Sequence, residues 1–123
     1  MISFDNFNMD DSGPIYMQII LHVKRGIAAG TIQDGDELPS RRLLSTLLGM
    51  NPNTVQKAYK MLEEEGLIAS HSGAKSYMVL TTETIEKVRK ELLEGDAVNM
   101  VAAMKQMGLS KAEALRLLEQ YWD

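Results

Sequence analysis

Residues 40–65 read SRRLLSTLLGMNPNTVQKAYKMLEEE, and this stretch decides the fold. Ser40 is a typical helix N-cap, and the leucine-rich run behind it ends at Gly49, so a short helix is expected. Pro52 lies between two asparagines, a composition that favours a turn followed by a helix start. The apolar side chains that follow have the spacing of one buried helix face, at Val55, Ala58, Tyr59 and Leu62. The stretch therefore predicts two helices joined by a short turn.

The charges in this stretch differ from those of the whole chain. The protein has 13 Lys and Arg against 17 Asp and Glu, a net charge of −4. Between Leu38 and Leu62, however, every charged residue is basic, namely Arg41, Arg42, Lys57 and Lys60. A basic surface on an acidic chain suits a protein that binds nucleic acid with one face, because phosphate contacts need Lys and Arg. A chance gap between acidic residues is the competing explanation.

The start of the second predicted helix carries side chains suited to reading base edges. Amide and hydroxyl groups pair with bases in the major groove, and they occur here at Asn51, Asn53, Thr54 and Gln56. Lys57 and Lys60, further along the helix, are placed on phosphates. The stretch is thus predicted to be a helix-turn-helix that binds double-stranded DNA.

The flanking segments complete one predicted domain. Pro14 opens a helix whose apolar residues recur every four positions, and Gly30 is placed to end it. Residues 31–39 predict a turn with a short extended piece at residues 37–38. Behind Gly66, residues 67–70 and 76–80 predict a β-hairpin, which makes the motif winged. Residues 1–13 are polar and lack periodicity, which predicts a flexible arm or one ordered only by a partner.

Residues 81–123 predict a helical tail. Gly95 and Asp96 interrupt its first helical pattern, either as a kink or as a tolerated weak position, and residues 110–113 have the spacing of a capping box. The tail has more apolar surface than two short helices can bury between themselves: Ile85, Val88, Leu92, Val101, Met104, Leu115, Leu118 and Trp122. We expect a second copy of the chain to cover it. Folding of the tail back onto its own winged domain is the alternative.

The predicted fold class is mostly α with a small β wing, a winged helix-turn-helix followed by a short C-terminal helical dimerisation tail. The domains expected are an arm at 1–13, a DNA-binding domain at 14–80 and the tail at 81–123. No cysteine is present, the two histidines lack clustered partners, and no apolar run approaches the ~20 residues of a membrane helix. A secretory signal pattern is absent as well, so we expect a cytoplasmic location.

Other function classes have weaker support in the sequence. We find no nucleophile with a paired base, no phosphate-binding glycine loop and no metal-ligand spacing, so no enzyme, cofactor or metal is expected. A winged helix that binds only other proteins remains the main alternative to DNA binding. The sequence does not indicate a small-molecule effector.

Several motifs in order resemble the GntR family of bacterial transcription regulators. They are PIYMQI at 14–19, LPSRR at 38–42, NTV at 53–55 and LEEEGLI at 62–68. The NPNTVQKAY stretch at 51–59 and the short tail resemble the YtrA-type subfamily. The resemblance implies a homodimer that binds an operator, usually as a repressor of a neighbouring operon of transporter type. A symmetric dimer further predicts that the operator is an inverted repeat.

The resemblance also assigns roles to residues. Arg42 matches an arginine that contacts DNA, and Gly73 matches a wing-tip glycine that approaches the minor groove. Arg41 departs from the family, which usually has an acid there, and Gln56 stands where many members have arginine. Leu43 replaces a glutamate that would complete a capping box with Ser40. The full predicted DNA-binding set is Ser40, Arg41, Arg42, Asn51, Asn53, Thr54, Gln56, Lys57, Lys60, His71, Ser72, Gly73 and Lys75.

Overall fold

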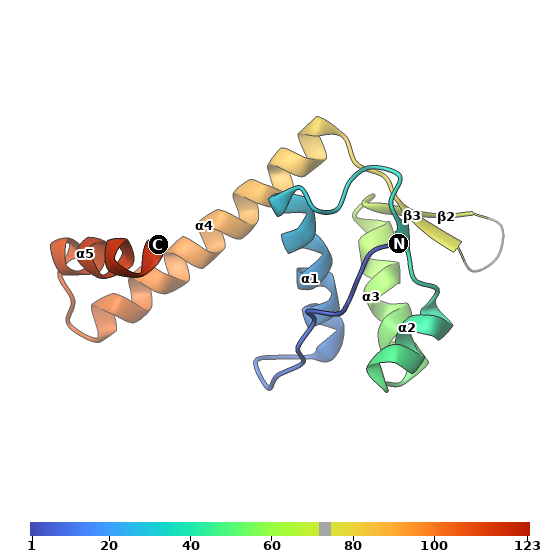
Figure 1. The fold of residues 1–123 in the computed structure, drawn as a ribbon, viewed down its shortest axis with the longest axis horizontal. Helices are drawn as coiled ribbons and strands as arrows, with labels where there is room; N and C mark the ends of the chain where they lie inside the picture. Colours follow the sequence, from blue (N-terminus) through green and yellow to red (C-terminus); the bar gives the residue numbers. More distant parts are fainter. Residues whose placement is uncertain (72–74) are drawn as a thin grey trace. The chain divides into compact units, whose positions relative to one another are not determined.

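The computed structural model describes residues 1–71 and 75–123, and contacts within the chain divide it into two units, Met1–Arg89 and Lys90–Asp123. The first unit contains most of the secondary structure and begins the long helix α4 (Figure 1). The elements are mostly helices with one small antiparallel sheet, so the predicted winged helix-turn-helix followed by C-terminal helices is confirmed.

The core of the first unit lies between α1 (Ile15–Ala29) and α3 (Pro52–Glu64), which pack against each other (Figure 1). The predicted stripe of α1 is buried from its second turn onward, whereas Ile15 in the first turn is exposed. All four predicted inward residues of α3 are fully buried: Val55, Ala58, Tyr59 and Leu62. Burial of such apolar side chains is the main favourable term in folding, so this interface holds α3 in place.

Helix α2 (Arg41–Leu48) is short and packs on α3. Leu44 is its fully buried contact, and Gly49 ends the helix with a φ of 64°, a left-handed conformation that glycine adopts without a steric penalty. Asn51 then caps α3 directly. The close spacing of Gly49 and Asn51 is what produces the predicted short turn between α2 and α3.

The sheet has the strand order β1-β3-β2 and is antiparallel throughout. Strands β2 (Ile68–His71) and β3 (Lys75–Met78) form the predicted hairpin. Strand β1 (Glu37–Leu38) pairs with β3 so that Glu37 lies opposite Tyr77. The extended piece at 37–38 was predicted from its composition, whereas its pairing with β3 across about 40 residues of chain leaves no local signal in the sequence.

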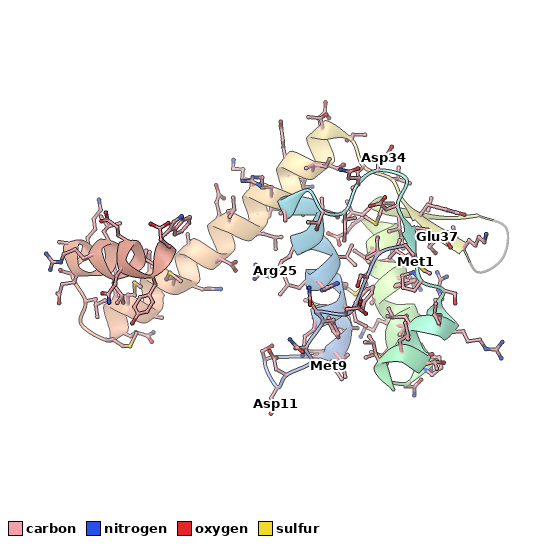
Figure 2. The ribbon with its side chains drawn as sticks, in the orientation of Figure 1. Met1, Met9, Asp11, Arg25, Asp34 and Glu37 are labelled. Carbon is pink, nitrogen blue, oxygen red and sulfur yellow. The ribbon has the colours of Figure 1, made fainter. Side chains whose placement is uncertain are left out.

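The N-terminal residues are packed in part, which differs from the flexible arm expected from their polarity. Ile2 and Phe4 are buried, and the Ile2 N–H donates a hydrogen bond of 2.8 Å to the Glu37 carbonyl oxygen. Figure 2 labels Glu37 beside the chain start at Met1. The Phe4 ring lies 4.6 Å from the ring of His22 on α1, centroid to centroid. Isolated apolar residues among polar ones gave no periodic pattern, so this docking was missed.

Helix α4 (Thr82–Gln106) begins in the first unit. Val88 is buried there, and Arg89 Nη1 donates a 2.7 Å hydrogen bond to the Ala28 carbonyl at the end of α1. The Leu80 N–H donates to Asp34 Oδ1, labelled in Figure 2, at 2.8 Å. The first unit therefore extends past Leu80, where the sequence placed the domain boundary, to Arg89.

The second unit comprises the rest of α4 and α5 (Lys111–Trp122). Helix α4 runs unbroken through Gly95, so the interruption in the pattern is a tolerated position within one helix. Ser110 and Glu113 form the predicted capping box of α5. No side chain of residues 90–123 is buried within the single chain. Among the described residues, no helix is long and apolar enough to cross a membrane.

Candidate nucleic-acid interface

The two arginines at the start of α2 differ in how far they are exposed to solvent. Arg42 is exposed, whereas Arg41 is half-buried. Ser40 Oγ accepts a 3.0 Å hydrogen bond from the Leu43 N–H, so its oxygen already caps the helix. The first role of Ser40 is therefore to define where α2 begins, which in turn places both arginines.

Arg41 is held against the core residue Tyr59. Its guanidinium carbon lies 5.3 Å from the centroid of the Tyr59 ring, and its Nε is buried without a hydrogen-bond partner in the described part of the chain. The Tyr59 hydroxyl donates a 2.7 Å hydrogen bond to the Pro39 carbonyl, immediately before α2. Burial raises the pKa of Tyr59, and the nearby Arg41 charge partly opposes this rise. The phenol is therefore neutral at physiological pH and remains a donor to Pro39.

The start of α3 combines a cap with exposed amides. Asn51 Oδ1 accepts a 2.8 Å hydrogen bond from the Asn53 N–H, and Pro52 occupies the first helical position. The side chains of Asn53 and Gln56 are exposed, and Thr54 is half-buried. Because the acceptor of Asn51 is used by the cap, its NH₂ group is the part that could meet a base. The positive dipole end of α3 would also favour a phosphate placed near Asn51.

The two lysines of α3 have different surroundings. Lys57 is exposed, yet its Nζ lies 4.0 Å from the ring centroid of Tyr16 on α1. Lys60 borders an open hollow of about 470 Å³ that also touches Arg41 and Gln56. Glu63 and Glu64 also line this hollow, so acidic side chains border the basic residues there. The two helices thus bring together the predicted residues from Ser40 to Arg42 and from Asn51 to Lys60.

The wing contributes Lys75, which is exposed at the start of β3 and lies opposite His71 in the strand register. The predicted wing residues Ser72 and Gly73, together with the side chain of His71, lie outside the described residues. Their assignments stay predictions. In the described part of the chain, no group of three or more His, Cys, Asp or Glu residues could hold a metal ion.

Two contacts of this surface were not found from the sequence. Tyr59 was predicted only as a core residue, and Tyr16 was given no role in DNA binding, but each ring also lies against a basic side chain of the predicted DNA-binding set. In both contacts the ring and the basic side chain belong to different helices: Tyr59 of α3 contacts Arg41 of α2, and Tyr16 of α1 contacts Lys57 of α3. Pairings between separate helices leave no periodic signal in a single sequence, so the fold was needed to show them.

Comparisons with known proteins agree on one family. Residues 15–77 match the family model of the bacterial regulatory proteins of the gntR family. The HTH-type transcriptional repressor YtrA of Bacillus subtilis (strain 168) is 41% identical over 96 residues, which cover 78% of this chain and 69% of YtrA.

Two solved structures extend the match beyond the winged domain. A GntR family transcriptional regulator from Listeria monocytogenes has a TM-score of 0.80 and 33% identity, covering 91% of this chain and 98% of its own. YtrA from Sulfolobus acidocaldarius, a GntR-family transcription factor, has a TM-score of 0.55 and 28% identity, covering 93% and 92%. The protein is therefore a DNA-binding transcription regulator rather than an enzyme, and the chain belongs to the GntR family of bacterial regulatory proteins.

Proposed function

We propose that this protein is a repressor that binds an inverted-repeat operator as a homodimer and controls a neighbouring operon of transporter type. The observation that carries the proposal is the surface formed by α2 and α3. It presents exposed amides and basic side chains, and no acidic residue occurs between Leu38 and Leu62. Repression is supported by the similarity to the B. subtilis repressor YtrA. Control of a transporter operon is inferred from the resemblance to YtrA-type regulators.

We assign separate tasks to the residues of this surface. Arg42, Asn53 and Gln56 are exposed at the starts of α2 and α3, and we place them on base edges. Lysine is a flexible point charge, so we place Lys60 and Lys75 on phosphates. Ser40 and Asn51 contribute mainly by capping the two helices. The proposed wing contacts of His71, Ser72 and Gly73 follow from the family resemblance.

Exposed apolar side chains in the tail support the proposal of a homodimer. Val101 is 50% exposed, Leu115 is 55% exposed and Trp122 is 83% exposed, although all three are apolar. An open apolar groove of about 450 Å³ runs between α4 and α5 within the second unit, lined by residues that include Met104 and Leu118. A second copy would remove this surface from water. Val88 is already buried in the first unit, so we leave it out of the proposed dimer face.

A symmetric dimer would present two α3 helices to two half-sites. Half-sites bound in this way lie one or two turns of DNA apart, roughly 34 Å per turn. The operator is therefore expected to be an inverted repeat with that spacing. A winged helix that binds only other proteins would not require a basic surface, and no feature of the described residues favours it.

A binding titration on the DNA upstream of the protein's own gene, at fixed salt, tests this function. Asn53→Ala and Arg42→Ala should each weaken operator binding by about 1–3 kcal/mol per half-site, roughly 5- to 150-fold for each half-site, and Asn53→Ala should relax base choice at one position in each half-site. Asn99→Ala, at an exposed position of α4, is the matched control and should bind as the wild type does. Unchanged binding by both folded variants would overturn the assignment of α2 and α3 as the reading surface.

A further inference from the structure

We propose that Tyr16 is a positioning residue for DNA binding, because its ring holds the ammonium group of Lys57 where the phosphate backbone will lie. The inference rests on the proposed function, since it assumes that the α2–α3 surface meets DNA. It adds the first turn of α1 to that surface, although no side chain of α1 was predicted to take part. The ring itself touches no DNA in this proposal and acts only through Lys57.

The geometry of the pair is that of a cation over an aromatic face. Lys57 Nζ lies 4.0 Å from the Tyr16 ring centroid, well within the ~6 Å at which such contacts are attractive. The two residues come from different helices, α1 and α3, which are packed through the core of the first unit. The relative positions of ring and lysine are therefore fixed by the fold rather than by a flexible loop.

The two partners differ in how firmly the protein holds them. Tyr16 is half-buried, and the helix that carries it is anchored by the buried residues Ile19 and Ile20. Lys57 is exposed, and a lysine on a free surface samples many rotamers. The ring restricts that sampling before DNA arrives. The Lys57 side chain therefore loses less conformational entropy when DNA binds, because it is already partly ordered in the free protein.

Lys60 provides an internal comparison. It lies on the same helix and is exposed, yet it makes no ring contact among the described residues. Both lysines can supply one positive charge to a phosphate. Only Lys57 has an aromatic support, so only its contribution should depend on Tyr16. A purely structural role, in which the pair merely ties α1 to α3, predicts no such selectivity.

The test uses the full-length protein and a labelled operator, with affinity measured across a range of salt concentrations. Lys57→Met should weaken binding and lower the log–log salt slope of the dimer by about two, because one phosphate contact is lost in each half-site. Tyr16→Leu should weaken binding about two- to fivefold per half-site with the slope nearly unchanged, because the charge remains and only its placement is lost. Tyr16→Phe keeps a ring and should restore most of the affinity.

A double-mutant cycle decides between positioning and structure. Tyr16→Leu should have no further effect in a Lys57→Met background and its full effect in a Lys60→Met background. An equal loss in both backgrounds, or a fall in melting temperature with affinity unchanged, would overturn the proposal. If the wild type binds the operator and Lys57→Met binds it with the same affinity, this inference fails while the proposed function stands. If the wild type binds no DNA, the proposed function itself fails.

Discussion

Tyr59 connects the hydrophobic core to the candidate DNA surface. Its ring is fully buried on α3, its hydroxyl bonds the Pro39 carbonyl, and Arg41 lies over its outer face. One side chain of α3 thus contacts the residues on both sides of the Ser40 cap, where α2 begins. The periodic pattern in the sequence predicted the burial, whereas the hydrogen bond and the Arg41 contact depend on which residues the fold brings near the ring.

Because folding raises the pKa of Tyr59, the free energy of unfolding should decrease as the pH becomes alkaline. The unfolded chain releases this proton near the ordinary value of 10.0, while the folded chain retains it to higher pH. The unfolded state is therefore favoured as pH rises above about 10, at up to ~1.4 kcal/mol per pH unit. Denaturant titrations from pH 8 to 11 should show a steeper alkaline loss for the wild type than for Tyr59→Phe. Tyr121→Phe, at an exposed position, is the control, and equal slopes for Tyr59→Phe and the wild type would contradict the prediction.

Two helical glycines should respond to alanine with opposite sign. A Cβ at Gly95 would meet nothing within 4 Å, so Gly95→Ala should stabilise the protein by about 0.5–1 kcal/mol. A Cβ at Gly26 would overlap Ile32 Cδ1 and lie 2.7 Å from its Cγ1. Overpacking of that kind costs about 1–3 kcal/mol and outweighs the helix gain, so Gly26→Ala should destabilise. Thermal melting measures both, and a rise in melting temperature for Gly26→Ala would show that Ile32 moves aside easily.

At the scale of elements, helix caps define the binding surface. Ser40 and Asn51, both predicted to touch DNA, use their oxygens to begin α2 and α3. The sequence identified Ser40 as a cap but did not assign Asn51 that task. Capping and base contact draw on different atoms of an asparagine, the carbonyl oxygen for one and the NH₂ group for the other. The two roles of Asn51 can therefore be separated by substitution.

Asn51→Asp and Asn51→Ala make that separation. Aspartate keeps an acceptor for the Asn53 N–H, so the melting temperature should stay near that of the wild type, whereas alanine should cost about 1 kcal/mol. Operator affinity should fall for both, and more for aspartate, because an added negative charge faces phosphates. Circular dichroism melting and operator titration measure the two properties. If affinity follows stability alone across both variants, Asn51 acts only as a cap.

The elements predicted best were those with local signals. Helices α1 and α3 follow from apolar spacing, their ends from glycine and proline, and the hairpin from two short extended runs. What could not be predicted depends on contacts between distant parts of the chain. The docking of Ile2 and Phe4, the pairing of β1 with β3, and the Tyr16–Lys57 contact all belong to this class. A single sequence carries no pattern from which such pairs can be deduced.

At the scale of the whole molecule, charge and apolar surface are segregated along the chain. The net charge of −4 coexists with a basic surface on α2 and α3, so positive charge is concentrated on one part of a chain whose total charge is negative. Just over half of the exposed large apolar side chains of the described residues lie in the tail, where Tyr121 and Trp122 are 76% and 83% exposed. The proposed homodimer accounts for this exposed surface.

Charge placed on the tail should dissociate the dimer. Leu118→Glu buries a carboxylate in the proposed face, which is unfavourable without a partner, so sedimentation at micromolar concentration should show monomers with weakened operator binding. Gln120→Glu adds the same charge at an exposed position of α5 and is the matched control. A monomeric wild type, or an intact Leu118→Glu dimer, would contradict this assignment.

Any truncated chain should end after Arg89 rather than Leu80, because Val88 and Arg89 pack in the first unit.

The docked N-terminus has a consequence for how the protein behaves at high concentration. Strand β1 lies at the edge of the sheet, and unpaired edge strands are templates for pairing with other molecules. Ile2 occupies part of that edge through its hydrogen bond to Glu37, and its side chain is buried there. The first few residues therefore protect the molecule against strand-to-strand aggregation. Displacement of Ile2 from this position would uncover the edge at Glu37.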